Sequence, residues 1–127
     1  MKALLDTHAF LWALAGDARM SRHARDVFTG STDLLLSIAS IWEILIKVHS
    51  GKLNFPRPAG PYVLRRLAEN RISSLPISID HLLALDRLPM HHRDSFDRML
   101  IAQSIEENLP VITADPLFGK YPVQIIW

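Results

Sequence analysis

Short apolar segments alternate with helical segments along the whole chain, and this alternation restricts the possible folds more than any other feature. Five segments have the length and composition of buried strands: residues 2–5, 34–37, 74–78, 110–113 and 123–126. Helices are expected around them, over residues 7–15, 21–28, 40–49, 62–70, 80–89, 95–108 and 115–121. Short apolar strands separated by helices are typical of a parallel sheet that is covered on both faces. The pattern therefore predicts an α/β fold: a three-layer α/β/α sandwich around a central five-stranded, mostly parallel sheet.

The composition is that of one folded domain. The chain has 127 residues, of which 49% are hydrophobic and 21% charged, so it is able to bury a core of the usual single-domain size. We therefore expect residues 1–127 to form one domain. The net charge of +1 argues against a strongly basic, histone-like binder. The absence of cysteine excludes disulfide scaffolds, zinc–thiolate sites, iron–sulfur clusters and thiol nucleophiles.

No segment has the pattern of a membrane span or a secretion signal. The most apolar stretch, residues 34–48, is shorter than the roughly 20 residues that a spanning helix needs, and it contains Glu43. The apolar residues 9–15 follow Asp6, and Lys2 is the only basic residue before them, which is the wrong flank for a signal sequence. We therefore expect a soluble cytoplasmic protein that does not associate with a membrane.

Two carboxylates stand at or just beyond the ends of expected strands. Asp6 follows the first strand directly, and Asp115 comes two residues after the strand at 110–113. Ligands of parallel sheets bind at the carboxyl ends of the strands, so both side chains are expected at the same functional edge. The alternative is that each carboxylate simply caps the helix that follows it, since Asp is a favoured N-cap residue.

Two further carboxylates lie in apolar helical surroundings. Glu43 is the only charged residue between positions 38 and 46, and a buried carboxylate needs a cation or a shared proton. An ion pair with Lys47, one turn further on, is the structural alternative. Asp97 has Leu100 and Ile101 as its neighbours on the helix, so we expect it to be half-buried. Asp94, at the start of this helix, is expected to cap it or to orient the metal-binding residues without binding the metal itself.

Four acids from four separate elements predict a metal site if they converge. Without a counter-charge they would repel one another and raise each other's pKa values. Oxygen ligands alone suit Mg²⁺ or Mn²⁺ better than zinc or copper. A metal-activated water that attacks a phosphodiester is the reaction that suits such a site.

Four segments of the chain also carry a family resemblance. They are LLDTHAFLW at residues 4–12, SIASIWEI at 37–44, HHRDSFDRMLIAQS at 91–104 and ITAD at 112–115. Together they resemble the PIN domain family, and within it the VapC-type toxins of bacterial toxin–antitoxin pairs. The resemblance covers essentially the whole chain, and it lies in the ordered set of four motifs.

The resemblance implies a Mg²⁺-dependent endoribonuclease, in which Mn²⁺ substitutes for Mg²⁺, on a five-stranded parallel sheet. It implies an acidic catalytic site made of Asp6, Glu43, Asp97 and Asp115. Asp6 and Asp97 match the principal metal ligands of the family. The supporting residues that the resemblance indicates are Thr7, Asp94 and Thr113.

The resemblance also implies partners. It implies a homodimer, a cognate antitoxin that covers the active-site groove, and a structured RNA substrate such as tRNA or rRNA. The alternative hypothesis is a non-catalytic PIN-fold module that binds RNA or a protein without cutting. The complete set of acids favours the enzyme.

For the remaining residues of interest, a purely structural role is the alternative to a functional one. The candidates for RNA contact are Lys47, Lys52, Arg57 and Arg98, and the alternative is a solvated basic face or, for Arg98, a pair with an acid such as Asp94. His91 and His92 are expected in a polar loop, because a hard cation does not need histidine. Trp42 lies among apolar residues and is expected in the core.

Overall fold

The computed structural model describes residues 1–127 and contains five strands, six α-helices and one 3₁₀ helix. The strands are β1 (Lys2–Leu5), β2 (Asp33–Ser37), β3 (Ser73–Leu75), β4 (Val111–Ile112) and β5 (Ile125–Ile126). The helices are α1 (Thr7–Ala15), α2 (Arg22–Thr29), α3 (Ile38–His49), α4 (Ala59–Glu69), α5 (Ile79–Arg87), α6 (Ser95–Glu107) and the 3₁₀ helix η1 (Pro116–Lys120).

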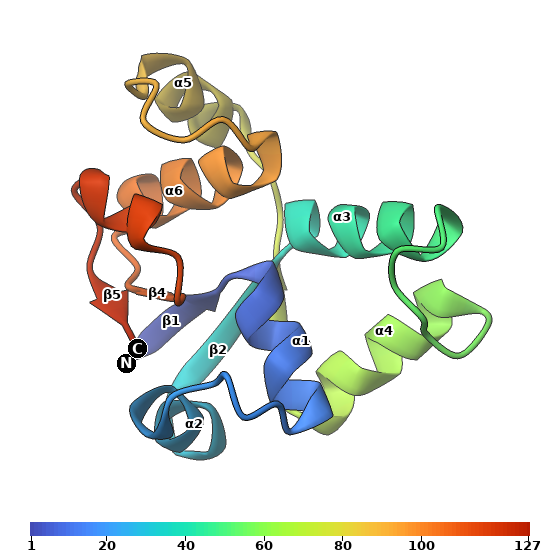
Figure 1. Ribbon diagram of the computed structural model, residues 1–127. Coiled ribbons are helices and arrows are strands. Elements are labelled where there is room, and N and C mark those ends of the chain that lie inside the picture. The colour runs from blue at the N-terminus through green and yellow to red at the C-terminus, as the bar shows by residue number, and fades with distance from the viewer.

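The strands form one sheet in the order β3-β2-β1-β4-β5, and every neighbouring pair is parallel. Successive residues of β1 point to opposite faces: Leu5 packs in the core with residues of α1, α2, α3 and α4, whereas Leu4 packs with residues of α6 and η1. Figure 1 shows α5 and α6 on one side of the sheet and α1, α2 and α4 on the other. The predicted α/β sandwich with a five-stranded parallel sheet is confirmed.

Several helix ends differ from the prediction because side-chain caps or proline determine them. α3 begins at Ile38 rather than at residue 40, since the Ser37 hydroxyl accepts the Ala39 N–H at 3.0 Å. α5 is capped by Ser78 and not by Asp80. β3 ends at Leu75, before Pro76, which has no N–H to donate to the sheet.

Trp42 is not in the core, so that prediction was wrong. Its side chain is 60% exposed, and Ile38 and Ile46 are exposed with it at intervals of one helical turn. α3 buries the opposite side, which includes Glu43 and Ile44. The helix therefore carries apolar residues on two sides, and only one of them faces the core.

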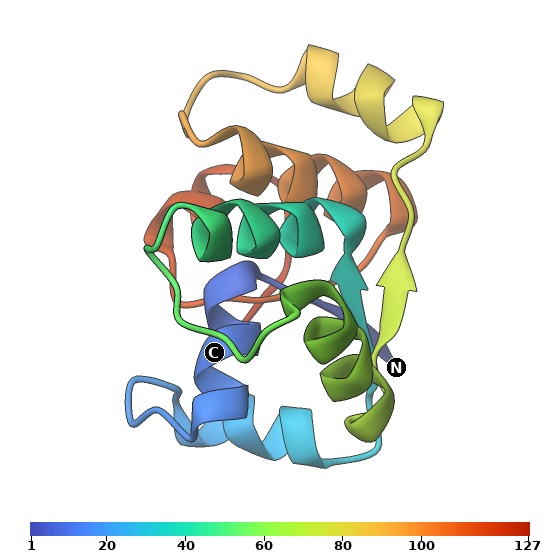
Figure 2. The ribbon, with the colours of Figure 1, turned by 90° about the vertical axis from the view of Figure 1, so that its right-hand side faces the viewer.

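The topology brings the two central strands, β1 and β4, to end side by side, with Leu5 paired to Ile112. α3 packs against both α1 and α6, and Figure 2 shows α3 and α6 running alongside each other above the start of α1. The residues that follow β1 and β4 therefore face residues from α3 and α6.

None of the helices has the length and apolar character that crossing a membrane requires.

Candidate active site

Asp6 is buried at the end of β1, where it caps α1 and lies at the edge of the sheet that the sequence indicated. Its Oδ1 accepts the Ala9 N–H at 2.6 Å, which caps α1, and its Oδ2 accepts the Thr113 hydroxyl at 2.5 Å. Burial raises the pKa of Asp6, although the hydrogen bonds from Thr113 and Ala9 oppose the rise. Capping and membership of the acidic site are compatible, because one oxygen faces the helix and the other faces β4.

Thr113 connects the ends of β1 and β4. Its hydroxyl donates to Asp6 and accepts the Asp115 N–H at 3.0 Å. Asp115 in turn caps η1, since its Oδ1 accepts the Leu117 N–H at 2.9 Å. The expected placement of Asp6 and Asp115 at one edge of the sheet is what the structure shows, and Thr113 links the segments that carry them.

Glu43 reaches the same edge from α3 and is buried. The Thr7 hydroxyl donates to its Oε1 at 2.8 Å, and the Lys47 ammonium lies 2.9 Å from its Oε2. The Ser40 hydroxyl lies 2.9 Å from that of Thr7. The ion pair with Lys47 that was the structural alternative is therefore present, and it compensates the charge of one acid of the group.

Asp97 lies in the first turn of α6, and its side chain is 21% exposed. Burial and the nearby charge of Asp94 raise its pKa to about 7, and the carboxylates of Asp6 and Glu43 add to the rise. Asp6 after β1 and Glu43 on α3 therefore lie near enough to Asp97 on α6 to affect its pKa. Asp94 caps α6, because its Oδ1 accepts the Asp97 N–H at 2.9 Å.

The structure adds His92, which we expected in a polar loop. His92 is buried, and its Nε2 lies 2.9 Å from Asp115 Oδ2 and 3.1 Å from Asp97 Oδ2. His91, its neighbour, is exposed. No signal in the sequence separates these two histidines, because the contacts of His92 join positions 5 and 23 residues apart.

The side chains at this edge suit a hard divalent cation. Their potential ligand atoms are almost all carboxylate oxygens, the donor type that Mg²⁺ and Mn²⁺ prefer. Burial raises the pKa values of Asp6 and Asp97, and neither residue has a lysine or arginine partner. One ligand atom each from His92, Asp97 and Asp115 lies within 4.8 Å of the others. A bound divalent cation would supply the positive charge that balances these carboxylates.

Two of the four candidates for RNA contact are engaged within the chain. Lys47 pairs with Glu43. Arg98 donates to the backbone carbonyls of Pro89 and Leu88, at 3.0 and 3.4 Å, and it does not pair with Asp94. Arg98 therefore holds the segment before α6, and the alternative that it pairs with an acid such as Asp94 is not what the structure shows.

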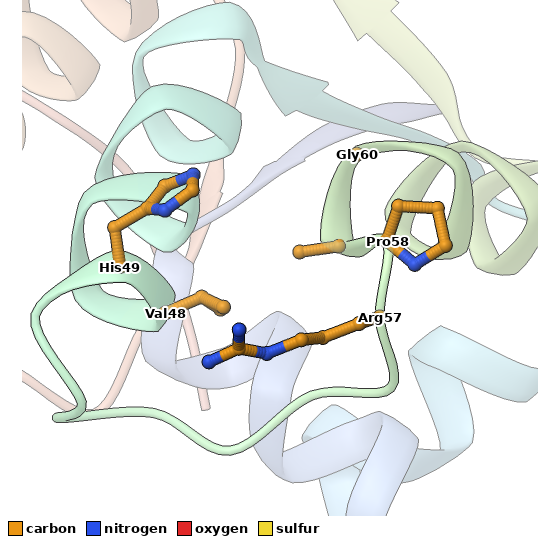
Figure 3. A pocket seen from close by; sticks show the side chains of 6 residues that line it. Val48, His49, Arg57, Pro58 and Gly60 are labelled. Carbon is orange, nitrogen blue, oxygen red and sulfur yellow. The ribbon is translucent and has the colours of Figure 1, made fainter.

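The other two candidates, Lys52 and Arg57, are exposed and make no ion pair. Arg57 lines a cavity of about 550 Å³ between the end of α3 and the start of α4, together with Val48 and His49. Figure 3 shows the Arg57 side chain extending across this space toward Val48. These two cations remain available to a ligand.

Comparisons with known proteins place this geometry in a family. The model of the PIN domain family matches residues 3–123. Ribonuclease VapC16 of Mycobacterium tuberculosis is 46% identical over 48 residues, which are 38% of this chain and 33% of that protein. The matched segment thus spans about a third of the length of this relative.

Solved structures show the same fold at low sequence identity. VapBC2 from Rickettsia felis, bound to a DNA fragment from its promoter, has a TM-score of 0.75 at 14% identity and covers 98% of this chain and 97% of its own. FitAcB from Neisseria gonorrhoeae has a TM-score of 0.68 at 18% identity, with 98% and 96% covered. A toxin–antitoxin complex from Klebsiella pneumoniae has a TM-score of 0.67 at 16% identity, also with 98% and 96% covered. Because the family model matches nearly the entire chain, the protein belongs to the PIN domain family.

Proposed function

We propose that this chain is a metal-dependent endoribonuclease that uses Mg²⁺, or Mn²⁺ in its place, and acts as the toxin of a toxin–antitoxin pair. The observation that carries the proposal is the convergence of Asp6, Glu43, Asp97 and Asp115 at one edge of the sheet. Only Glu43 has a lysine partner there. Buried acids without a cationic partner cost stability, so they indicate a site built for a cation.

Asp6 and Asp97 are the residues that we assign as principal metal ligands, with Glu43 and Asp115 completing the acidic site. When bound, a divalent cation supplies an activated water and neutralises charge on the phosphodiester. The chain orients the carboxylates beforehand: Thr113 holds Asp6, and Thr7 with Lys47 holds Glu43. These hydrogen bonds reduce the rearrangement that metal binding requires.

The proposed partners follow from the relatives and from the surface. One relative, VapC16, is a ribonuclease by name, and one of the similar solved structures is a toxin–antitoxin complex. We infer an RNA substrate of the tRNA or rRNA class, a cognate antitoxin and a homodimer. The exposed apolar side chains of Ile38, Trp42 and Ile46 along α3 support a protein partner, since such a stripe is costly to leave in water. Lys52 and Arg57 are the cations that we assign to RNA phosphates.

The test is RNA cleavage by the purified chain, free of antitoxin, with total bacterial RNA and with Mg²⁺, Mn²⁺ or EDTA. We expect discrete fragments that require the metal, and a loss of at least about 100-fold in rate for Asp97→Asn and Asp6→Asn. Asn retains the ability to cap α1, so Asp6→Asn leaves that helix start intact. Asp86→Asn, on the exposed surface of α5, is the matched control and should cut as the wild type does.

A non-catalytic binding module would give a different result. RNA would stay intact under every condition, and both variants would bind it with unchanged affinity. Cleavage that survives in Asp97→Asn would contradict the assignment of the site.

A further inference from the structure

The His92 ring is held in one orientation by contacts on several sides. Its own backbone N–H donates to the Tyr121 hydroxyl oxygen at 2.9 Å, and its ring stands edge-on to Phe118 with centroids 6.0 Å apart. Its Nδ1 accepts the backbone N–H of Asp94 at 3.2 Å. An imidazole nitrogen that accepts a hydrogen bond carries no proton, so the proton of the neutral ring sits on Nε2.

The Nε2 atom of His92 lies close to two acids from different elements, and its hydrogen bond goes to Asp115. Asp115 Oδ2, before η1, lies at 2.9 Å, and Asp97 Oδ2, on α6, lies at 3.1 Å. The second oxygen of Asp115 is already occupied by the Leu117 N–H. The second oxygen of Asp97 makes no hydrogen bond within the chain, so Oδ1 is the atom of Asp97 that is free for a ligand.

We propose that His92 is a positioning residue of the metal site: it donates its Nε2–H to Asp115, lies against Asp97 Oδ2 at 3.1 Å, and stays outside the coordination shell, so that Asp97 Oδ1 is left for the cation. This inference rests on the proposed function and deepens it. It assigns the site to carboxylate oxygens alone, even though His92 lies close enough to be counted among the ligands. A site of this kind takes a hard divalent cation such as Mn²⁺ or Mg²⁺.

Direct coordination by His92 conflicts with its hydrogen bonds. A metal at Nε2 needs the lone pair of that nitrogen, which moves the ring proton to Nδ1. The proton would then face the backbone N–H of Asp94, so two donors would stand 3.2 Å apart. Asp94 is held in this position, because its Oδ1 and its carbonyl oxygen accept the N–H groups of Asp97 and Arg98 in the first turn of α6.

The tautomer is tested without any metal, by ¹⁵N NMR of the histidine rings in the full metal-free chain. We expect the signals of a protonated Nε2 and an unprotonated Nδ1 for His92, identified by their absence in His92→Gln. A proton on Nδ1 and a bare Nε2 would overturn the assignment. This measurement does not depend on whether the protein cuts RNA.

The role of His92 is tested by Mn²⁺ binding and by pulsed EPR of the bound ion. His92→Gln places an amide donor near the position of Nε2, so we expect it to bind Mn²⁺ within about threefold of the wild type. His92→Leu removes the donor and should weaken binding by about 10–100-fold. His92→Asn is too short to reach both acids and should weaken binding similarly, which provides a second variant if His92→Leu does not fold.

His91→Leu is the matched control and should leave the affinity unchanged, since His91 makes no side-chain hydrogen bond to an acid. The EPR spectrum of bound Mn²⁺ should show no directly coordinated nitrogen in the wild type. A nitrogen signal that disappears in His92→Gln would overturn the proposal, as would wild-type affinity in His92→Leu. If the wild type binds no Mn²⁺, the proposed function itself fails and this role fails with it.

Discussion

Two histidines are buried in this molecule, and comparing their surroundings distinguishes a structural contact from a functional one. His81 Nδ1 accepts the Ser78 N–H at 3.0 Å, just as His92 Nδ1 accepts the Asp94 N–H at 3.2 Å. In both rings the acceptor role of Nδ1 leaves the proton on Nε2, and in both that proton faces a carboxylate. The local pattern is therefore the same.

The carboxylates that the two histidines meet are different. His81 faces one acid, Glu107, whose side chain is 43% exposed at the end of α6, and the Gln103 amide lies 3.3 Å from its Nδ1. His92 faces two acids, Asp97 and Asp115, that are both mostly buried. Water stabilises Glu107, so His81 only joins α5 to α6. Asp97 and Asp115 are less open to water, with 21% and 30% of their side chains exposed, so His92 stabilises charge within the acidic group itself.

The largest effect that we expect concerns the charge at the sheet edge. The folded chain raises the pKa of Asp97 from 3.8 to about 7, mainly through burial. A raised pKa means that folding favours the protonated acid, so the contribution of Asp97 to stability is fully present below about pH 4. This contribution is lost as the pH rises toward 7. Asp97→Asn removes this loss and should raise the free energy of unfolding at pH 8 by about 2–4 kcal/mol.

Urea unfolding in EDTA at pH 4.5 and pH 8 measures this effect, and the difference between the two proteins should be much larger at the higher pH. The groups that face Asp97 are His92, Asp94, Asp6 and Glu43, so their charges contribute to the same pH dependence. A variant that is less stable than the wild type at pH 8 would mean that Asp97 is a structural acid, like Glu107. The comparison between the two histidines would then fail.

The next effect concerns the contact between α5 and α6. His81→Leu removes a buried hydrogen-bonding ring and leaves the Ser78 N–H without its partner, whereas the Gln103 amide keeps only its hydrogen bond to the Pro76 carbonyl. We expect a loss of about 1–3 kcal/mol in the free energy of unfolding. Mn²⁺ affinity should stay at the wild-type value, since none of the four acids touches His81. If Mn²⁺ affinity fell as it should in His92→Leu, the two regions would be coupled, and the distinction between them would be lost.

The smallest effect concerns the start of α5. The Ser78 hydroxyl accepts the His81 N–H at 3.2 Å and forms a capping box with the His81 ring. Ser78→Ala should lower the free energy of unfolding by about 1 kcal/mol, in thermal or urea unfolding. In the double variant with His81→Leu, the two losses in the free energy of unfolding should be non-additive, because both changes break the same capping box. Additive losses would show that the ring and the hydroxyl act independently.

Much of the site follows from local signals in the sequence. Asp6 and Asp115 stand directly after strands, and the ends of parallel strands meet at one edge. Glu43 is the one charge in an apolar helical segment, so its burial was predictable, and so was its pair with Lys47 one turn away. In each of these cases the relevant neighbours are close in sequence, or the geometry of a sheet dictates their position.

Other features have no local signal. His91 and His92 are adjacent and chemically identical, yet only His92 is buried against the acids. Trp42 is apolar and yet exposed, because α3 already fills its core-facing side with other residues. Arg98 donates to carbonyls of the chain ahead of α6 rather than to an acid.

The sequence by itself determined the alternation of strands and helices, and hence the parallel sandwich and the edge at which the acids lie. It does so because backbone geometry and the period of apolar residues act over a few positions. Only the tertiary structure decided which side chain bridges Asp97 and Asp115, and which apolar face of α3 stays outside. Those outcomes depend on how elements far apart in the chain pack against one another. A small rotation of a helix about its axis changes which of its side chains meet a neighbouring element.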